Sequence, residues 1–328
     1  MEQQKIRIGI LSTANIGKRS TIPAILALPD YFELVGIASR NLPAAELVAK
    51  EFNCEAFGTY EELLKKDLID AVYIPLPNSL HHQWVKHALT EGIHVVVEKS
   101  LGCNLEEVKE LTEIAEKNNL ALLENFQFRF HPQLKCIQDQ LASGKIGTLR
   151  YIRSSFEFPP FPDQTNIRYQ KELSGGALLD AGAYPLKISQ LFLGRDISVA
   201  ASTLRYDNEL GVDLGGGAFL KQNEGDLYSE VSFGFDNFYQ CSIELFGTKG
   251  KISTNRIFSA PPGYSPNIKI EVSGPAETIE LEPSNHFIHM LEHFYQVINS
   301  DTIRKDEYLQ NVNQSRLIQE LYNFANGK

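Results

Sequence analysis

The first third of the chain alternates short apolar runs with segments of helical period. The runs KIRIGIL, YFELVGIASR, DAVYIPLP, IHVVVEKS and LALLENF are typical of strands buried in a parallel sheet. Helices are predicted between them, over residues 15–28, 43–52, 79–92 and 104–119. Repeated strand–helix units with short connections require right-handed crossovers. The pattern therefore predicts an α/β, Rossmann-type doubly wound parallel sheet.

The pattern changes after about residue 125. A helix over residues 131–147 is followed by the alternating strand TLRYIRSSFEF and a glycine-led helix over 175–194. Between residues 197 and 281, β-rich runs separated by turn residues predict an antiparallel meander, and helices near 286–298 and 309–324 finish the chain. We predict two domains: residues 1–124, and an α+β domain over residues 125–328 with an open, mainly antiparallel sheet. The C-terminal helix is free to pack back on the first domain.

Composition narrows the class of protein. The formal charge of −10 argues against nonspecific nucleic-acid binding. The four cysteines lie far apart, without metal-ligand spacing, and read as reduced thiols. Neither a signal peptide nor an apolar run of membrane-spanning length is evident, so we expect a cytoplasmic protein with no membrane partner. An open sheet needs cover on one face, which predicts a homo-oligomer, either a dimer or a tetramer.

The loop after the first strand, STANIG, resembles a dinucleotide-binding turn that lacks two of its three glycines. Ser12, Ala14 and Gly17 occupy the glycine positions, and two of them carry small side chains in place of hydrogen. The hydroxyls of Ser12 and Thr13 are candidate donors to phosphate, at the start of a helix whose free N–H groups favour anions. A plain β-turn-α is the alternative. The candidate cofactor-binding residues of this loop are Ser12, Thr13, Ala14, Asn15 and Ile16.

The end of the second predicted strand bears on the choice of cofactor. An NAD site places Asp or Glu there to bind the ribose 2′-hydroxyl, whereas this chain has Ser39 and Arg40. A hydroxyl and a guanidinium suit a 2′-phosphate through charge-assisted hydrogen bonds. A solvated arginine after a strand is the ordinary alternative. Together with the first loop, the pair favours NADP(H) over NAD(H).

Three motifs give the chain a family resemblance: PNSLH at residues 77–81, GIHVVVEKS at 92–100 and GGALLDAGAYP at 175–185. In this order and spacing they resemble the Gfo/Idh/MocA oxidoreductases, over essentially the whole chain. The resemblance implies a cofactor site lined by Pro75, Leu76, Asn78, His81, Glu98 and Lys99. The family usually has proline where this chain has Ser100, a change expected to loosen the backbone after the lysine.

The same resemblance suggests the chemistry. Many members carry Asp and, four residues later, His; here Asp180 is followed by Tyr184, as in the glucose–fructose oxidoreductase, dihydrodiol dehydrogenase and sugar-nucleotide 3-ketoreductase branches. Hydride transfer to a ketone builds negative charge on oxygen, so an acid must supply a proton. We expect Tyr184 to donate it with Lys99 as electrostatic partner, and the reverse assignment stays open. Arg168 and Asp180 are candidates for orienting sugar hydroxyls. The alternatives are a surface arginine for Arg168 and, for Asp180, a carboxylate that supports Lys99 structurally.

The leading hypothesis is an NADP(H)-dependent oxidoreductase acting on a carbohydrate carbonyl or hydroxyl, as a keto-sugar or sugar-nucleotide ketoreductase. A trans-dihydrodiol or aldose dehydrogenase is a second enzyme hypothesis, and a non-catalytic NADP(H)-binding regulator is a third of another class. His81 and His82 do not complete a metal site, because neighbouring residues on a helix point apart. No metal is expected.

Overall fold

The structure, a computed structural model, describes residues 5–327. The chain divides into two compact units, one of residues 5–125 with 287–312 and the other of residues 126–286 with 313–327. Helix α9 (Asp301–Ala325) contributes to both units. Among the described residues, no helix combines the length and the apolarity needed to cross a bilayer.

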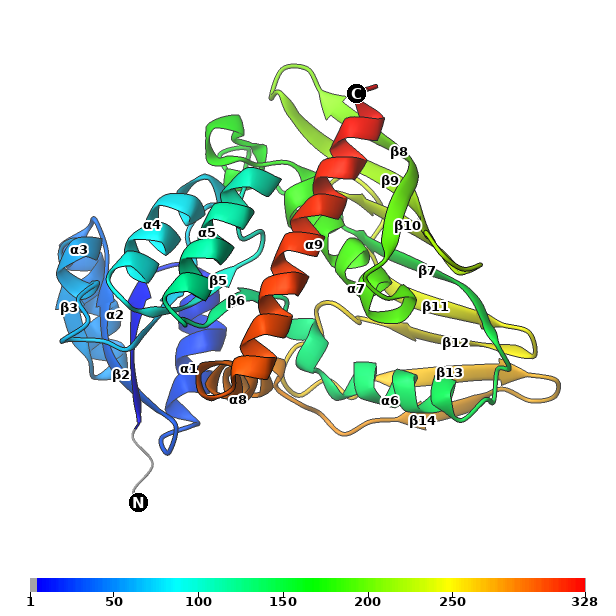
Figure 1. Cartoon of the computed structure of the whole chain (residues 1–328), viewed down its shortest axis with the longest axis horizontal. Helices are drawn as coiled ribbons and strands as arrows, with labels where there is room; N and C mark the ends of the chain where they lie inside the picture. The colour runs from blue at the N-terminus through cyan, green and yellow to red at the C-terminus, as the bar shows by residue number, and fades with distance from the viewer. Residues whose placement is uncertain (1–4, 328) are drawn as a thin grey trace. The chain divides into compact units, whose positions relative to one another are not determined.

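The first unit is built on a six-stranded sheet in the order β3-β2-β1-β4-β5-β6, and every pairing is parallel (Figure 1). This confirms the predicted doubly wound fold. Helices α4 and α5 pack side by side, and their apolar faces share a core with the middle strands. The strands are β1 (Ile6–Leu11), β2 (Phe32–Ala38), β3 (Glu55–Phe57), β4 (Ala71–Ile74), β5 (His94–Glu98) and β6 (Leu122–Asn125). The helices are α1 (Ile22–Leu26), α2 (Leu42–Phe52), α3 (Tyr60–Leu63), α4 (Asn78–Thr90), α5 (Leu105–Lys117) and α8 (His286–Asn299), with α8 in this unit from Phe287.

Two helices of the chain contain a wider, π-helical turn near their start, and in each a proline follows. The turn Gly17–Thr21 precedes α1, which contains Pro23, and the turn Leu178–Gly182 precedes α7 (Ala183–Leu193), which contains Pro185. Proline has no N–H and its ring crowds the carbonyl one turn back, so a locally widened turn relieves that contact. Both wide turns lie in segments that the sequence assigns to function.

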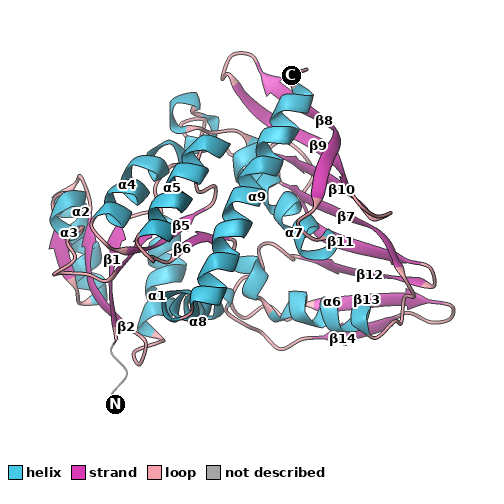
Figure 2. Cartoon of the chain, in the orientation of Figure 1, coloured by secondary structure: helices cyan, strands magenta, loops and turns pink. Residues whose placement is uncertain are grey.

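The second unit carries an eight-stranded sheet in the order β14-β13-β12-β11-β7-β10-β9-β8 (Figure 2). Its pairings are antiparallel except that of β10 with β7, which is parallel. The elements are α6 (Pro132–Ala142), β7 (Leu149–Glu157), α7, β8 (Ile197–Asp207), β9 (Val212–Gln222), β10 (Tyr228–Gly234), β11 (Gln240–Gly247), β12 (Gly250–Asn255), β13 (Asn267–Val272) and β14 (Glu277–Glu280).

Two predictions from the sequence, the antiparallel meander and the start of the last helix, need correction. Strand β7 lies between β10 and β11, so the run of antiparallel neighbours is interrupted where the earliest strand of this unit is inserted. Helix α9 begins at Asp301 rather than near residue 309. Its first turn has no apolar period, but Ser300 precedes it as a cap: the Ser300 hydroxyl accepts from Ile303 N at 3.5 Å, and its carbonyl accepts the first helical bond from Arg304 N at 2.9 Å.

The two faces of the eight-stranded sheet differ in chemistry. One face, with Ile152, Val231 and Ile243, packs on α7 and the end of α9 in a single buried cluster. The other face carries stacked rings: Tyr151 lies 4.9 Å from Tyr228 and 4.4 Å from Phe246 between ring centroids. Because side chains alternate across a strand, these rings cannot join the core. We call them the aromatic row.

Candidate active site

The dinucleotide-type loop keeps the backbone of a glycine turn without the glycine. Ser12 has a φ of +89°, in the left-handed half of conformational space that side chains rarely adopt. Its amide donates to Ala38 O at 2.7 Å, which fixes the loop against the end of β2. The hydroxyl, expected as a phosphate donor, instead donates to Pro75 O and accepts from Ala14 N, each at 3.2 Å. Ser12 therefore shapes the loop through bonds within the protein.

The other residues of this loop are partly accessible, and they lead into the start of a helix. Thr13, Ala14 and Ile16 are half-buried and Asn15 is exposed. The helix begins at Asn15, so the first N–H groups have no partners one turn back. Such a terminus fits the pyrophosphate of a dinucleotide, by hydrogen bonding and by the helix dipole.

The end of β2 presents a cation. Ser39 is buried, donates its amide to Phe57 O and accepts from Asn41 N at 3.2 Å. Asn41 in turn caps α2, where its side chain accepts from Ala44 N. Arg40 is exposed and lies beside the Tyr60 hydroxyl, where its charge and hydrogen bond oppose the burial that raises the pKa of Tyr60. Within residues 5–327 Arg40 forms no ion pair with a carboxylate. Its guanidinium is available to an anion at this edge of the sheet.

The ends of β4, β5 and β6 are joined by a carboxylate. Glu98 Oε1 accepts from Tyr73 Oη and from Asn125 Nδ2, both at 2.7 Å. These bonds hold Glu98 on the protein side of the strand end, directly before Lys99. The bonds therefore fix the end of β5 from which Lys99 follows, and the role of Glu98 in cofactor binding stays a prediction.

His81 links the two loops that follow β4 and β5. The ring is fully buried; Nε2 lies 2.8 Å from Leu76 O and Nδ1 lies 2.7 Å from Ser100 O. Burial lowers its pKa to about 4, against the two carbonyls, and the charge of Lys99 lowers it further. Both nitrogens are engaged within the protein, so any effect of His81 on a cofactor acts through these loops. Pro75 and Leu76 are buried beside it, and Asn78 opens α4 half-buried.

The backbone after Lys99 is held in place, contrary to the expectation from Ser100. The Lys99–Ser100 peptide is cis. Ser100 O contacts His81 Nδ1, and Leu101 N donates to Glu124 Oε1 at 2.8 Å. These contacts fix the loop without a proline ring. Lys99 itself is half-buried at the end of β5.

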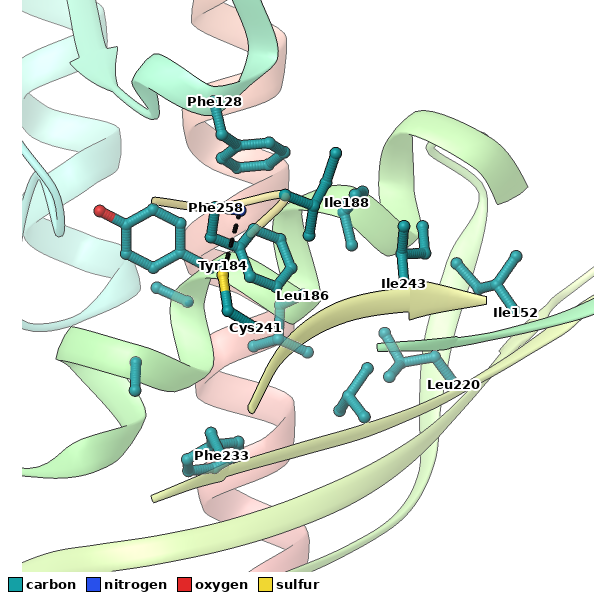
Figure 3. Packing of buried hydrophobic residues seen from close by; sticks show 14 of the residues in the cluster. Phe128, Ile152, Tyr184, Leu186, Ile188, Leu220, Phe233, Cys241, Ile243 and Phe258 are labelled. Atoms are coloured by element: carbon teal, nitrogen blue, oxygen red, sulfur yellow. Dashed lines mark hydrogen bonds between the residues drawn. The ribbon is translucent and has the colours of Figure 1, made fainter. Parts of the chain in front are cut away.

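In the second unit, Tyr184 sits in a cage of aromatic rings. Its ring centroid lies 5.0 Å from Phe156, 5.5 Å from Phe126, 5.6 Å from Phe258 and 5.9 Å from Phe128. Figure 3 shows the Tyr184 hydroxyl pointing away from Phe128, Phe258 and the other side chains labelled there. The residue is 7% exposed. The four rings therefore fix the tyrosine ring, and its hydroxyl lies on the side away from Phe128 and Phe258.

Arg168 and Asp180, both predicted to orient a substrate, are paired with each other. Arg168 Nε lies 2.6 Å from Asp180 Oδ2, and the carboxylate raises the pKa of the guanidinium, with Tyr184 contributing. The guanidinium also lies 4.9 Å over the ring of Phe161. The pair holds the Arg168 fork beside Tyr184. The roles of Arg168 and Asp180 in orienting a substrate stay predictions.

One residue that the sequence analysis missed supports this helix. Asp213, at the start of β9, accepts from Leu178 N at 2.6 Å, and its carboxylate also bonds the Ala177 amide. Gly176 has a φ of +112°, and a Cβ there would lie 2.3 Å from Asp213 Oδ1. Asp213 thus caps the segment that carries Asp180 and Tyr184. It is 35 residues from Leu178 along the chain, and a single acid in a glycine-rich run gives no signal of that contact.

Metal-ligating groups do not cluster in the part of the chain that the structure describes: no three His, Cys, Asp or Glu side chains there are grouped to hold an ion. His82 pairs with Glu110 at 2.7 Å, while His81 points to the backbone. The two histidines thus have separate partners.

A parallel sheet with a dinucleotide-type loop, joined to an open antiparallel sheet that carries a caged tyrosine, defines the class of two-unit nucleotide-dependent oxidoreductases. Two family models match: residues 6–126 fit "Oxidoreductase family, NAD-binding Rossmann fold", and residues 135–253 fit "GFO/IDH/MocA C-terminal domain". The chain belongs to the GFO/IDH/MocA oxidoreductase family. The family resemblance, the fold class and the assignment as an enzyme are confirmed.

Relatives with known names are similar over most of the chain. The dTDP-3,4-didehydro-2,6-dideoxy-alpha-D-glucose 3-reductase of Actinomadura kijaniata is 37% identical, over 90% of this chain and 88% of that enzyme. D-xylose 1-dehydrogenase (NADP(+)) 2 of Haloferax volcanii is 32% identical, over 97% and 96%. A crystal structure of a 3-ketoreductase from Actinomadura kijaniata with NADP and TDP-benzene has a TM-score of 0.93 at 35% identity, covering 98% of both chains.

Proposed function

We propose that this oxidoreductase uses NADP(H) to reduce a keto group on a sugar attached to a nucleoside diphosphate. The observation that carries the proposal is the match, over 98% of both chains, to a 3-ketoreductase crystallised with NADP and TDP-benzene. The exposed Arg40, without a carboxylate partner in residues 5–327, supports a 2′-phosphate in place of a free ribose hydroxyl. This narrows the leading hypothesis from the sequence, a keto-sugar or sugar-nucleotide ketoreductase, to a nucleotide-linked sugar.

The residues of the first unit fit this cofactor. The pyrophosphate would be held by the backbone of Thr13, Ala14, Asn15 and Ile16. The 2′-phosphate would be bound by Ser39 and Arg40. The rest of the cofactor would lie against the loops that contain Pro75, Leu76, Asn78 and Lys99. When bound, the cofactor supplies the hydride. His81 and Glu98 keep these loops in place through the bonds described above.

Tyr184 is proposed to donate the proton that the reduced carbonyl oxygen needs. Its hydroxyl, on the side away from Phe128 and Phe258, suits this role, and the aromatic cage keeps the ring from turning. Lys99 is proposed as the electrostatic partner, stabilising the charge that develops on oxygen. The reverse assignment gives the lysine the proton and the tyrosine the stabilising hydrogen bond. Arg168 and Asp180 are proposed to orient the sugar, with the guanidinium donating to hydroxyl oxygens.

A side-by-side titration with NADPH and NADH, followed by nicotinamide fluorescence, tests the cofactor. Nicotinamide absorbance with a dTDP-linked keto-sugar, D-xylose and a trans-dihydrodiol then tests the substrate. The similarity to a D-xylose dehydrogenase makes an aldose the second candidate. Tyr184→Phe and Lys99→Ala should abolish turnover and retain NADPH binding, whereas a non-catalytic regulator would show no turnover to lose. Turnover of D-xylose without turnover of the nucleotide sugar would refute the proposal.

The aromatic row is proposed as a contact between copies of this chain, in a dimer or a tetramer. Beside it runs an ionic ladder in which Arg153 pairs with Glu230 at 2.8 Å and Lys251 with Glu244 at 2.9 Å. Flat rings edged by paired charges are suited to a self-complementary surface. Sedimentation of the wild type and of Tyr228→Glu tests the proposed contact, and a monomeric wild type would refute it.

A cytoplasmic location also stays a proposal.

A further inference from the structure

Arg256 is an exposed cation that lies close to two tyrosine rings. Its guanidinium carbon lies 5.3 Å from the ring centroid of Tyr239 and 5.8 Å from that of Tyr264. Two cation–π contacts restrict this exposed side chain. Part of its rotational freedom is thus lost before any ligand binds.

The backbone that carries Arg256 is also fixed. The residue directly follows β12 and has a φ of +53°, in the left-handed region. Its carbonyl accepts from Ser259 N at 3.3 Å and lies 3.5 Å from Gln133 Nε2. The Tyr239 hydroxyl lies 3.2 Å from Ser259 Oγ, so one ring of the pair is tied to the same loop.

This loop reaches the proposed proton donor. Phe258, two residues after Arg256, packs its ring 5.6 Å from that of Tyr184 between centroids. The Phe258 amide donates to Cys241 Sγ at 3.4 Å, the contact drawn in Figure 3. The separation along the backbone between Arg256 and Phe258 is at most about 7 Å. Phe258 therefore connects the loop of Arg256 to the aromatic rings around Tyr184.

The charge of Arg256 has no counterion among residues 5–327, although the chain is acidic overall, with a formal charge of −10. Other arginines of this unit pair with carboxylates: Arg153 with Glu230, and Arg205 with Asp236. An arginine fork that is preorganised and uncompensated suits a bidentate anion, of which a phosphate is the best match in size and geometry.

We propose that Arg256 binds the diphosphate of a sugar nucleotide and so selects nucleotide-linked sugars over free sugars. This role of Arg256 rests on the proposed function, because the diphosphate belongs to the substrate proposed there. Tyr239 and Tyr264 hold the guanidinium in position, and Phe258 sets the loop against Tyr184. Binding involves charge-assisted hydrogen bonds and no covalent step.

The test is a titration of the NADP⁺-loaded protein with dTDP by calorimetry, repeated at low and high salt. Arg256→Gln should weaken dTDP binding about ten- to a hundredfold, the range expected for hydrogen bonds to charged groups. Arg256→Lys keeps the charge without the fork and should recover part of the loss. Arg150→Gln removes another exposed arginine of the same unit and should change nothing. Matched thermal unfolding of all variants separates binding from folding.

The outcomes separate this inference from the proposed function. Loss of dTDP binding in Arg256→Gln but not in Arg150→Gln supports the site, whichever keto-sugar is turned over. Equal dTDP affinity in wild type and Arg256→Gln, or no dTDP binding to the wild type, overturns it. Turnover of a dTDP-linked keto-sugar with an unchanged KM in Arg256→Gln upholds the proposed function and overturns the role of Arg256.

Discussion

Replacing Asp213 with Asn is expected to change how the stability of the protein depends on pH. Burial raises the pKa of this carboxyl to about 6, even though the amides of Leu178 and Ala177 bond to the charged form. An unfolded aspartate titrates at about 3.9. The folded protein therefore holds more protons than the unfolded chain between about pH 4 and pH 6.

The direction of the pH dependence of stability follows from this difference in bound protons. The contribution of Asp213 to the free energy of unfolding is complete below pH 4 and is lost as the pH rises through 6. The interval from about 3.9 to about 6 corresponds to about 3 kcal/mol, and water access to a half-buried group reduces it to about 2 kcal/mol. Asparagine does not titrate, so Asp213→Asn removes this dependence.

Urea unfolding followed by circular dichroism at several pH values between 4 and 7 measures the effect. The difference between wild type and Asp213→Asn should change by about 2 kcal/mol across this interval. Asp207→Asn makes the same charge change at the end of β8 and serves as the control. Parallel curves for wild type and Asp213→Asn would refute the reasoning. Asp213→Ala also removes the cap and should lower kcat while leaving NADPH affinity unchanged.

Three further predictions concern single residues. Arg40→Ala should weaken NADPH binding about ten- to a hundredfold and leave NADH binding unchanged, as measured by nicotinamide fluorescence, because only NADPH carries a 2′-phosphate. Burial, with the charges of Lys66 and Arg304, lowers the pKa of His94 to about 4. The contribution of the neutral ring to stability is therefore complete above about pH 6.5 and is lost as the pH falls through 4. In urea unfolding at pH 4, His94→Gln should thus retain about 2 kcal/mol more stability than the wild type. Gly176→Ala should lower stability by more than Gly144→Ala in thermal unfolding, because both positions have positive φ but only at Gly176 does the new Cβ meet Asp213.

The parts of the fold that the sequence predicts are those built from contacts near in the chain. The helices and the parallel strands of the first unit follow from period, caps and β-branched runs, because each unit of strand and helix is local. Strand β3, with three residues and no alternation, gives no such signal. The start of α9 was missed because the Ser300 cap, and not an apolar period, begins it.

The position of β7 could not be read from the pattern of strands. Strands that follow one another usually pair, which predicts β10 beside β11. In the structure both flank β7, with Val231 opposite Ser154 and Ile243 opposite the same residue. Which strand lies between β10 and β11 depends on how all the strands of the sheet together bury their apolar face. The sequence of a single strand does not determine this.

The candidate site shows the same division between local and distant contacts. Tyr184, Asp180 and Lys99 are found from motifs because each motif is a continuous segment. The partners that place them are distant: Asp213 reaches the helix of Tyr184 from β9, and Asn125 reaches Glu98 from β6. Polar contacts of this kind depend on sheet order, so they become visible only once strands are assembled.

The opening loop shows why its weak motif was still informative. A glycine is needed at its first position for the sake of the backbone, since the turn requires a positive φ. Ser12 adopts that φ at some cost in strain and recovers stability through its bonds to Pro75 and Ala14, which a glycine could not form. The side chain that breaks the motif thus supplies the hydrogen bonds that hold the motif's conformation. A dinucleotide loop is therefore better recognised by its place between strand and helix than by a count of its glycines.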